Sequence, residues 1–179
     1  MSWMQTYSGI KFDPLNPSPD DISIIDIAHA LSNICRFTGH TRDFYSVGQH
    51  SIIVSYFCSP QNKLWGLLHD ASEAYIADIA RPLKRSNDMK IYREIEDYVM
   101  AAVCKKFNLA YKMPEEVREM DNRCLYTEKR DLLNHDIDWG WKVEPFTTKI
   151  VPMENKIIKE AFLYEFSRLT SNSPIIGVN

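Results

Sequence analysis

The chain has 179 residues, of which 45% are hydrophobic and 25% are charged, an ordinary composition for one globular domain. Its formal net charge of −3 provides no general attraction for nucleic acid or for anionic membranes. No apolar stretch approaches the roughly 20 residues that span a bilayer. These features argue against a nucleic-acid duplex or a membrane as the partner.

The four cysteines include no CxxC pair, which disfavours a cysteine zinc knuckle. They lie in apolar surroundings, so we expect buried, reduced thiols. The first residues lack the basic and apolar regions of a signal peptide. We therefore expect a cytoplasmic protein, or one of the host cytoplasm if the chain is encoded by a phage.

Apolar residues recur at helical spacing through most of the chain and predict an all-α protein with one domain over residues 1–179. We expect an irregular, proline-rich arm at residues 1–20, a mobile tail at 171–179 and a single short strand near 147–151. A short helix should follow Glu73. The other expected helices cover residues 22–35, 45–58, 61–71, 86–108, 114–133 and 154–169. The inward positions of these helices include Ile25, Ile91 and Ile157.

The most informative stretch is an apolar run, Leu64 to Leu68, that ends in the pair His69-Asp70. An apolar run at helical spacing packs inward and carries this pair into or beside the core. Buried ionisable groups need partners there, and a divalent metal ion is one such partner. Taken alone, the pair is better explained as a helix C-terminus with a solvated aspartate and a capped histidine.

Two further polar residues, His50 and Asp121, lie on the apolar stripes of two other predicted helices. Taken alone, His50 is better explained as a core histidine, and Asp121 as an edge residue paired with Arg118 or Arg123. Together with His69-Asp70, however, they supply two imidazoles and two carboxylates in the order H…HD…D. Such a set suits zinc, manganese or iron, leaves positions open for water and substrate, and fits inside a helical bundle.

This order resembles that of the HD superfamily of metal-dependent phosphohydrolases, over about residues 20–133. Neighbouring sequence motifs are also similar to those of its small 5′-deoxynucleotidase branch and of small phage and bacterial members, some of which are dATP triphosphohydrolases. These motifs are Asp26-Ile-Ala-His-Ala-Leu31, Cys35-Arg-Phe-Thr-Gly-His40, Phe44-Tyr-Ser-Val-Gly-Gln-His-Ser51, His69-Asp-Ala-Ser-Glu-Ala-Tyr75, Arg81-Pro-Leu-Lys84 and Thr127-Glu-Lys-Arg-Asp-Leu-Leu133. The resemblance implies an HD-domain bundle with the metal site in its core.

The resemblance also implies roles for individual residues. The metal ligands are His50, His69, Asp70 and Asp121, holding zinc, manganese or cobalt, with magnesium possible alongside phosphates. Glu73 orients the attacking water or takes its proton, and Asp78 is a second catalytic acid near the scissile ester. The substrate-binding residues are Arg36, Phe37, Arg81, Pro82 and Lys84. One departure is Arg36-Phe37-Thr38, where branch members often have Arg-Trp-Pro.

We therefore expect an enzyme that hydrolyses dATP to deoxyadenosine and triphosphate and so depletes the dATP pool. The alternative is a 5′-deoxynucleotidase that converts dNMPs to deoxynucleoside and phosphate. A cyclic-dinucleotide or alarmone hydrolase lacks support, because the Gly-Tyr-Pro word is absent. A metal-stabilised binding protein would need neither Glu73 nor Arg36. The partner is a small nucleotide, and a homo-oligomer is expected, a hexamer in preference to a dimer.

Overall fold

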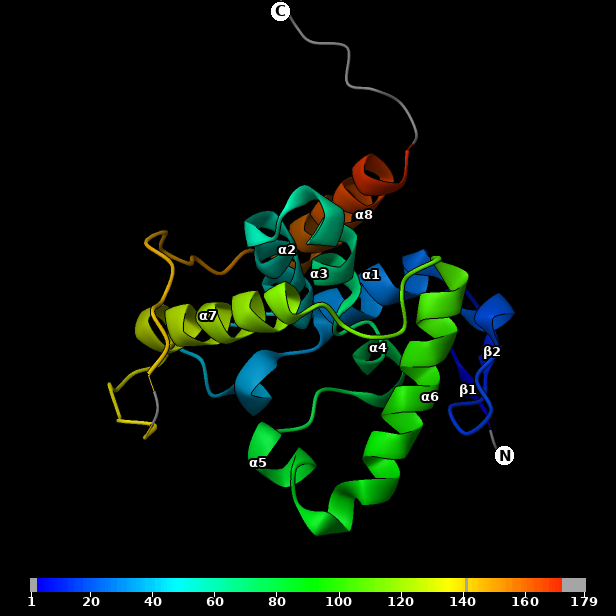
Figure 1. Ribbon diagram of the computed structural model, residues 1–179, viewed down its shortest axis with the longest axis horizontal. Helices are drawn as coiled ribbons and strands as arrows, with labels where there is room; N and C mark the ends of the chain where they lie inside the picture. Colours follow the sequence, from blue (N-terminus) through cyan, green and yellow to red (C-terminus); the bar gives the residue numbers. More distant parts are fainter. Residues whose placement is uncertain (1–2, 141, 172–179) are drawn as a thin grey trace, which may run out of the picture.

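The computed structural model describes residues 3–140 and 142–171, and its fold is mostly helical (Figure 1). The helices are α1 (Ile24–Asn33), α2 (Val47–Phe57), α3 (Lys63–Leu68), α4 (Glu73–Ile76), α5 (Arg81–Lys84), α6 (Lys90–Lys106), α7 (Glu115–Leu132) and α8 (Asn155–Thr170). Four 3₁₀ turns lie between them, η1 (Pro19–Asp21), η2 (Arg36–Gly39), η3 (Pro60–Asn62) and η4 (Asn87–Met89). The all-α prediction is confirmed. Of the tail expected at 171–179, residues 172–179 lie outside the described residues.

Helix α2 is the centre of the bundle, because it contacts α1, α3, α7 and α8. It is buried on more than one side, and small or polar residues fill much of its buried surface. Gly66 of α3 allows the two helices to approach closely. A methyl group added at Gly66 would lie 2.9 Å from the Cα atom of Ser55 in α2. The short distance between α2 and α3 also brings a histidine ring of α2 close to a histidine ring at the end of α3.

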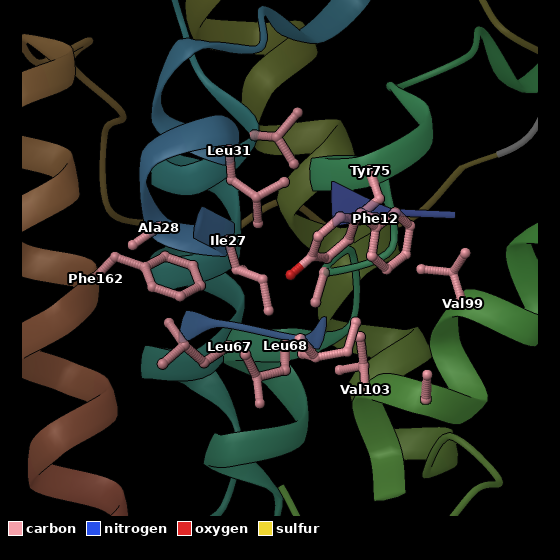
Figure 2. Packing of buried hydrophobic residues seen from close by; sticks show 14 residues of the cluster. Phe12, Ile27, Ala28, Leu31, Leu67, Leu68, Tyr75, Val99, Val103 and Phe162 are labelled. Carbon is pink, nitrogen blue, oxygen red and sulfur yellow. The ribbon is translucent and has the colours of Figure 1, made fainter. Parts of the chain in front are cut away.

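The main apolar core lies between α8 on one side and α6 on the other, with α1 and α3 in the middle (Figure 2). Phe162 of α8 packs beside α1, and Val99 and Val103 of α6 close the opposite side. Burying a large apolar side chain contributes about 1.5–3 kcal/mol, so these contacts fix the helices that carry the polar site.

The prediction of an irregular arm at residues 1–20 is wrong in part. Residues Met4–Gln5 (β1) and Lys11–Phe12 (β2) form a short antiparallel hairpin, with Met4 opposite Phe12. Phe12 is fully buried and stacks on Tyr75 with ring centroids 4.2 Å apart. The hairpin escaped prediction because its strands have two residues each, too few to show an alternating pattern.

The strand expected near residues 147–151 is not formed. This segment instead follows α7 as an irregular chain, because side chains of that helix satisfy its backbone. The carboxylate of Asp131 accepts from the Ile150 amide at 2.7 Å, and the Thr127 hydroxyl accepts from the Phe146 amide at 2.8 Å.

The helix expected over residues 61–71 is also interrupted. Helix α3 ends at Leu68, and α4 begins at Glu73 after a tight turn. Three positions expected to face inward are instead exposed, namely Ile25, Ile91 and Ile157. The buried neighbour of Ile157 is Ile158, so the apolar face of that helix is narrower than predicted.

The four cysteines are free thiols, and all except the partly exposed Cys35 are buried, as expected. In the part of the chain that the structure describes, no helix has both the length and the apolar character needed to cross a membrane.

Candidate metal centre

Three helical segments bring four predicted ligand residues to one point. The Nε2 atom of His50, in α2, lies 3.2 Å from the Nε2 atom of His69 at the end of α3. It lies 3.2 Å from Oδ1 of Asp121, in α7. The Asp70 atom Oδ2 lies 3.2 Å from His69 Nε2 and 3.7 Å from His50 Nε2. The ligand atoms of His50, His69 and Asp121 are close enough together to hold one metal ion, and Asp70 Oδ2 borders them.

The two histidines form the buried floor of this centre, and the two aspartates form its more open side. His50 is fully buried, and the His69 side chain is 2% exposed. The Asp70 and Asp121 side chains are each 20% exposed. The arrangement leaves the carboxylate side of the centre accessible to a ligand.

Hydrogen bonds on the far side of each ring fix the tautomers of the histidines. His69 Nδ1 lies 2.8 Å from the carbonyl oxygen of Gly66, which can only accept, so Nδ1 carries the proton. His50 Nδ1 lies 2.6 Å from the Glu128 carboxylate and donates to it in the same way. In the neutral form of each ring, Nε2 is then the nitrogen that can bind a metal ion.

Two imidazole Nε2 atoms and two carboxylates at one point could hold a metal ion. Their nitrogen and oxygen donors suit zinc, manganese or cobalt. The remote hydrogen bonds to a carbonyl and a carboxylate are those that metal-binding histidines usually make. The residues present therefore fit the divalent ion expected from the sequence.

A second group of possible ligands, His50, Cys124 and Glu128, lies on the other side of the His50 ring. Burial, with help from Glu128, raises the pKa of the Cys124 thiol to about 12, so the thiol stays neutral and is a poor metal ligand. Glu128 already accepts hydrogen bonds from Arg36, Tyr45 and His50. This side of the ring is therefore occupied by protein groups.

Glu128 is a site residue to which the sequence analysis gave no role. Burial acts to raise its pKa, but the Arg36 and His50 side chains outweigh burial and lower it to about 2. Its spacing could have revealed it, because Glu128 lies two helical turns after Asp121, on the same face of α7.

The tight turn after α3 places the predicted catalytic residue Glu73 beside the centre. Amide hydrogen bonds in this turn connect residues three apart, as from Glu73 to Asp70, at 3.0 Å. Three residues per turn make Asp70 and Glu73 eclipse one another on a single face. Glu73 is 5% exposed, and within the described residues its Oε2 atom has no hydrogen-bond partner.

Glu73 holds its proton more tightly than an ordinary glutamate does. Burial, with the nearby carboxylates of Asp70 and Asp78, raises the pKa of Glu73 well above its ordinary range. Burial likewise raises the pKa of the half-buried Asp78, although Arg36 acts in the opposite direction. Asp78 follows a strained turn in which Ala77 has a φ of 70°. Two acids with raised pKa values are suited to general acid–base work.

Arg36 lies against the centre, and Phe37 lies beside it. The Arg36 Nη1 atom is 3.5 Å from Asp70 Oδ2, and the guanidinium is 5.7 Å from the centre of the Phe37 ring. Phe37 and Thr38 have φ values of 53° and 52°, an unfavoured conformation for residues other than glycine. Arg36 is buried, whereas Phe37 is only partly so.

The other predicted substrate residues lie on α5. Arg81 donates to Oδ2 of Asp121 at 3.3 Å and to the Asn122 amide oxygen at 3.2 Å. The arginine that pairs with Asp121 is therefore Arg81, not Arg118 or Arg123 as in the alternative explanation of this residue. Lys84 pairs with Glu96 of α6, and its Nζ atom lies 4.0 Å from Glu73 Oε1. Pro82 is exposed on α5.

Formal charge supports a cation at this centre. Three basic side chains, those of Arg36, Arg81 and Lys84, face six carboxylates, those of Asp70, Glu73, Asp78, Glu96, Asp121 and Glu128. This surplus of carboxylates favours a bound cation.

Comparison with known proteins finds relatives that share most of the chain. No protein-family profile matches it. The uncharacterized protein YfdR of Escherichia coli is 42% identical over 132 residues, which cover 74% of this chain and 73% of that protein. An uncharacterized protein of Rhodobacter capsulatus is 36% identical over 126 residues, which cover 65% of this chain and 64% of that protein.

Proposed function

The chain belongs to the family of Escherichia coli YfdR, and we propose from its own site residues that it is a metal-dependent phosphohydrolase of deoxynucleotides. One observation carries the proposal. Two histidine Nε2 atoms 3.2 Å apart border two carboxylates, and the buried Glu73, with one unpartnered oxygen, lies one turn from Asp70. A structural metal site would need only the four ligands. The additional buried acid and the adjacent arginine support a site that performs chemistry.

His50, His69, Asp70 and Asp121 would hold the metal ion. When bound, such an ion lowers the pKa of water and polarises a phosphoryl oxygen. The sequence order of these ligands and the words around them support placing the chain in the HD superfamily.

The remaining residues divide the work of hydrolysis. Arg36 binds the α-phosphate with a guanidinium that suits phosphate oxygens. Glu73, in its ionised form, takes a proton from the water whose oxygen forms a bond to the α-phosphorus. The bond between this phosphorus and the 5′-oxygen breaks, and Asp78 gives a proton to the departing 5′-oxygen. The raised pKa of Asp78 suits that donation.

The resemblance to phage and bacterial members makes dATP the first candidate substrate, with deoxyadenosine and triphosphate as products. Phe37 and Pro82 are the candidate contacts for the base. The same bond is broken in a deoxynucleoside monophosphate, so the chemistry above serves either substrate.

One observation favours the monophosphate as a second candidate. Each basic residue predicted to hold phosphate already faces a carboxylate: Arg36 faces Glu128 and Asp70, Arg81 faces Asp121, and Lys84 faces Glu96. A long phosphate chain would have to draw Arg81 and Lys84 away from these acids. A monophosphate requires only Arg36.

We also propose a homo-oligomer. Apolar side chains are exposed on the two helices that flank the bundle, at Ile91 and Tyr98 of α6 and at Ile157 and Tyr164 of α8. A monomeric mass by light scattering at micromolar concentration would contradict this.

The test of function is a substrate panel. The purified protein, loaded with manganese, cobalt or zinc, is incubated with each dNTP and dNMP, and nucleoside, phosphate and triphosphate are resolved. Triphosphate released from dATP supports the first candidate, and phosphate released from dNMPs with dATP untouched supports the second. No phosphate release from any nucleotide by metal-loaded protein would reject the proposal.

A further inference from the structure

Glu128 is a fully buried carboxylate behind the candidate metal centre. Its side chain is 0% exposed, and it lies on the face of α7 that also carries Asp121. An ionised carboxylate costs free energy in such a place unless its oxygens are paired. The groups that pair with Glu128 therefore indicate why a charge is kept there.

The two oxygens of Glu128 face two different functional groups. Oε1 accepts from Nδ1 of His50 at 2.6 Å and from the hydroxyl of Tyr45 at 3.0 Å. Oε2 accepts from Nε of Arg36 at 3.2 Å and forms an ion pair with Nη2 at the same distance. One carboxylate thus joins a metal-facing histidine to the arginine assigned to phosphate.

Each contact fixes the end of the partner that faces the site. The bond to His50 Nδ1 holds a proton there and fixes the ring so that Nε2 faces His69 and Asp121. A carboxylate at the remote nitrogen also makes an imidazole a stronger ligand. The hydrogen bond at Nε and the ion pair at Nη2 turn this edge of the Arg36 guanidinium toward Glu128, and Nη1 lies 3.5 Å from Asp70.

We propose that Glu128 is a positioning residue that aligns His50 for the metal ion and Arg36 for the phosphate at the same time. This inference rests on the proposed function, because it takes both roles from it. A carboxylate that only tied α7 to the segment before α2 would affect stability and nothing else. A residue that aligns ligands must also change the affinity of the site.

The experiment replaces one oxygen of this carboxylate. In Glu128→Gln the amide keeps the shape and can still accept from His50, but its NH₂ group cannot accept from Arg36. Co²⁺ affinity of the full chain is measured by competition with a chelator, and inorganic phosphate binding is measured on the Co²⁺-loaded protein. We expect Co²⁺ to bind about 10–100-fold more weakly, with an altered visible absorption spectrum. Phosphate binding should weaken as well.

Glu116→Gln is the matched control on the same helix. The Glu116 carboxylate accepts from the Ser59 amide at 2.8 Å and from Asn62, neither of which is a proposed metal ligand. This variant should lower Tm without changing Co²⁺ affinity. If Glu128→Gln fails to fold, Glu128→Asp keeps the charge but shortens the side chain by one methylene, and it is measured in the same way.

The outcomes distinguish failure of the positioning role of Glu128 from failure of the proposed metal site. A folded Glu128 variant with wild-type affinity for both Co²⁺ and phosphate overturns the positioning role and leaves the metal site standing. Wild-type protein that binds no Co²⁺ overturns the proposed metal site and this inference with it.

Discussion

The candidate site has an inner and an outer half, which are held in different ways. The inner half, His50, His69 and Glu128, is buried, and hydrogen bonds fix the far side of both histidine rings. The outer half, Arg81, Pro82 and Lys84, lies on the four-residue helix α5, away from α1 and α8 (Figure 1). Its two basic side chains are 36% and 26% exposed and pair with acids of the site.

The difference separates two tasks. A metal ligand set must be rigid before the ion arrives, because small displacements weaken binding. Groups that recognise a substrate can reorient as it enters, and weak, half-exposed ion pairs permit this. We therefore expect changes in the inner half to abolish function and changes in the outer half to adjust it.

The largest effect is expected for loss of an inner ligand. His69→Ala removes one of the two Nε2 donors, so elemental analysis should find little metal and phosphate release should be lost. Metal added to wild-type protein should raise Tm, since an ion at 100 times its Kd contributes about 2.7 kcal/mol. Chelation should reverse this rise, and the variant should not show it.

His135→Ala is the control, because His135 is exposed and belongs to neither half. It should retain both metal and activity. Full metal content in His69→Ala would show that the ligand set is wrong.

The next effect concerns Glu73, which borders the inner half without belonging to the ligand set. Glu73→Gln keeps the volume but cannot take a proton from water, so kcat should fall by about 10²–10⁴-fold. Metal content and nucleotide affinity should remain.

Glu119→Gln, at an exposed position of α7, provides the comparison for Glu73→Gln. A Glu73 variant with normal kcat would leave this glutamate as a residue that shapes the turn after α3.

Packing between α2 and α3 should matter more for the inner half than for the fold as a whole. In Gly66→Ala the new methyl would meet Ser55 Cα at 2.9 Å and Cys58 Sγ at 3.0 Å. Overpacking of this kind costs about 1–3 kcal/mol, measurable by denaturant unfolding. It should also weaken metal binding, because the Gly66 carbonyl holds His69.

Gly9→Ala separates these two effects. Its methyl would meet nothing within 4 Å, and only the φ of +87° opposes it. A loss of metal affinity in this variant, or none in Gly66→Ala, would contradict the role given to packing.

The inner and outer halves also differ in how far the sequence could predict them. His50 and Asp121 were found because apolar neighbours at helical spacing carried them inward, and the helices are present in the structure. The close contact between His50 and His69 could not be predicted, because it depends on the approach of α2 and α3 at Gly66. Whether these residues bind metal stays a prediction.

Loops and short elements were beyond the reach of periodicity. The partners of Arg81 and Lys84 depend on how the turn before α6 folds, and a helix of four residues shows no repeating pattern. For the same reason the hairpin at residues 4–12 was missed, and a strand was wrongly predicted at residues 147–151. Glu128 could have been predicted as a site residue, since its spacing from Asp121 places it on the same face of α7.

The smallest effect is expected in the outer half, and it distinguishes the two candidate substrates. Lys84→Ala removes a cation that lies near Glu73 and pairs with Glu96. If the substrate is dATP, Lys84 contacts a phosphate beyond the first, and KM should rise about 10-fold, equivalent to about 1.4 kcal/mol. For dAMP the change in KM should be much smaller. Lys90→Ala removes an exposed lysine that pairs with Glu94 one turn along α6, and it should change neither value. An equal rise in KM for dATP and dAMP would show that Lys84 acts through Glu73 instead. Lys84 would then belong with the inner half of the site.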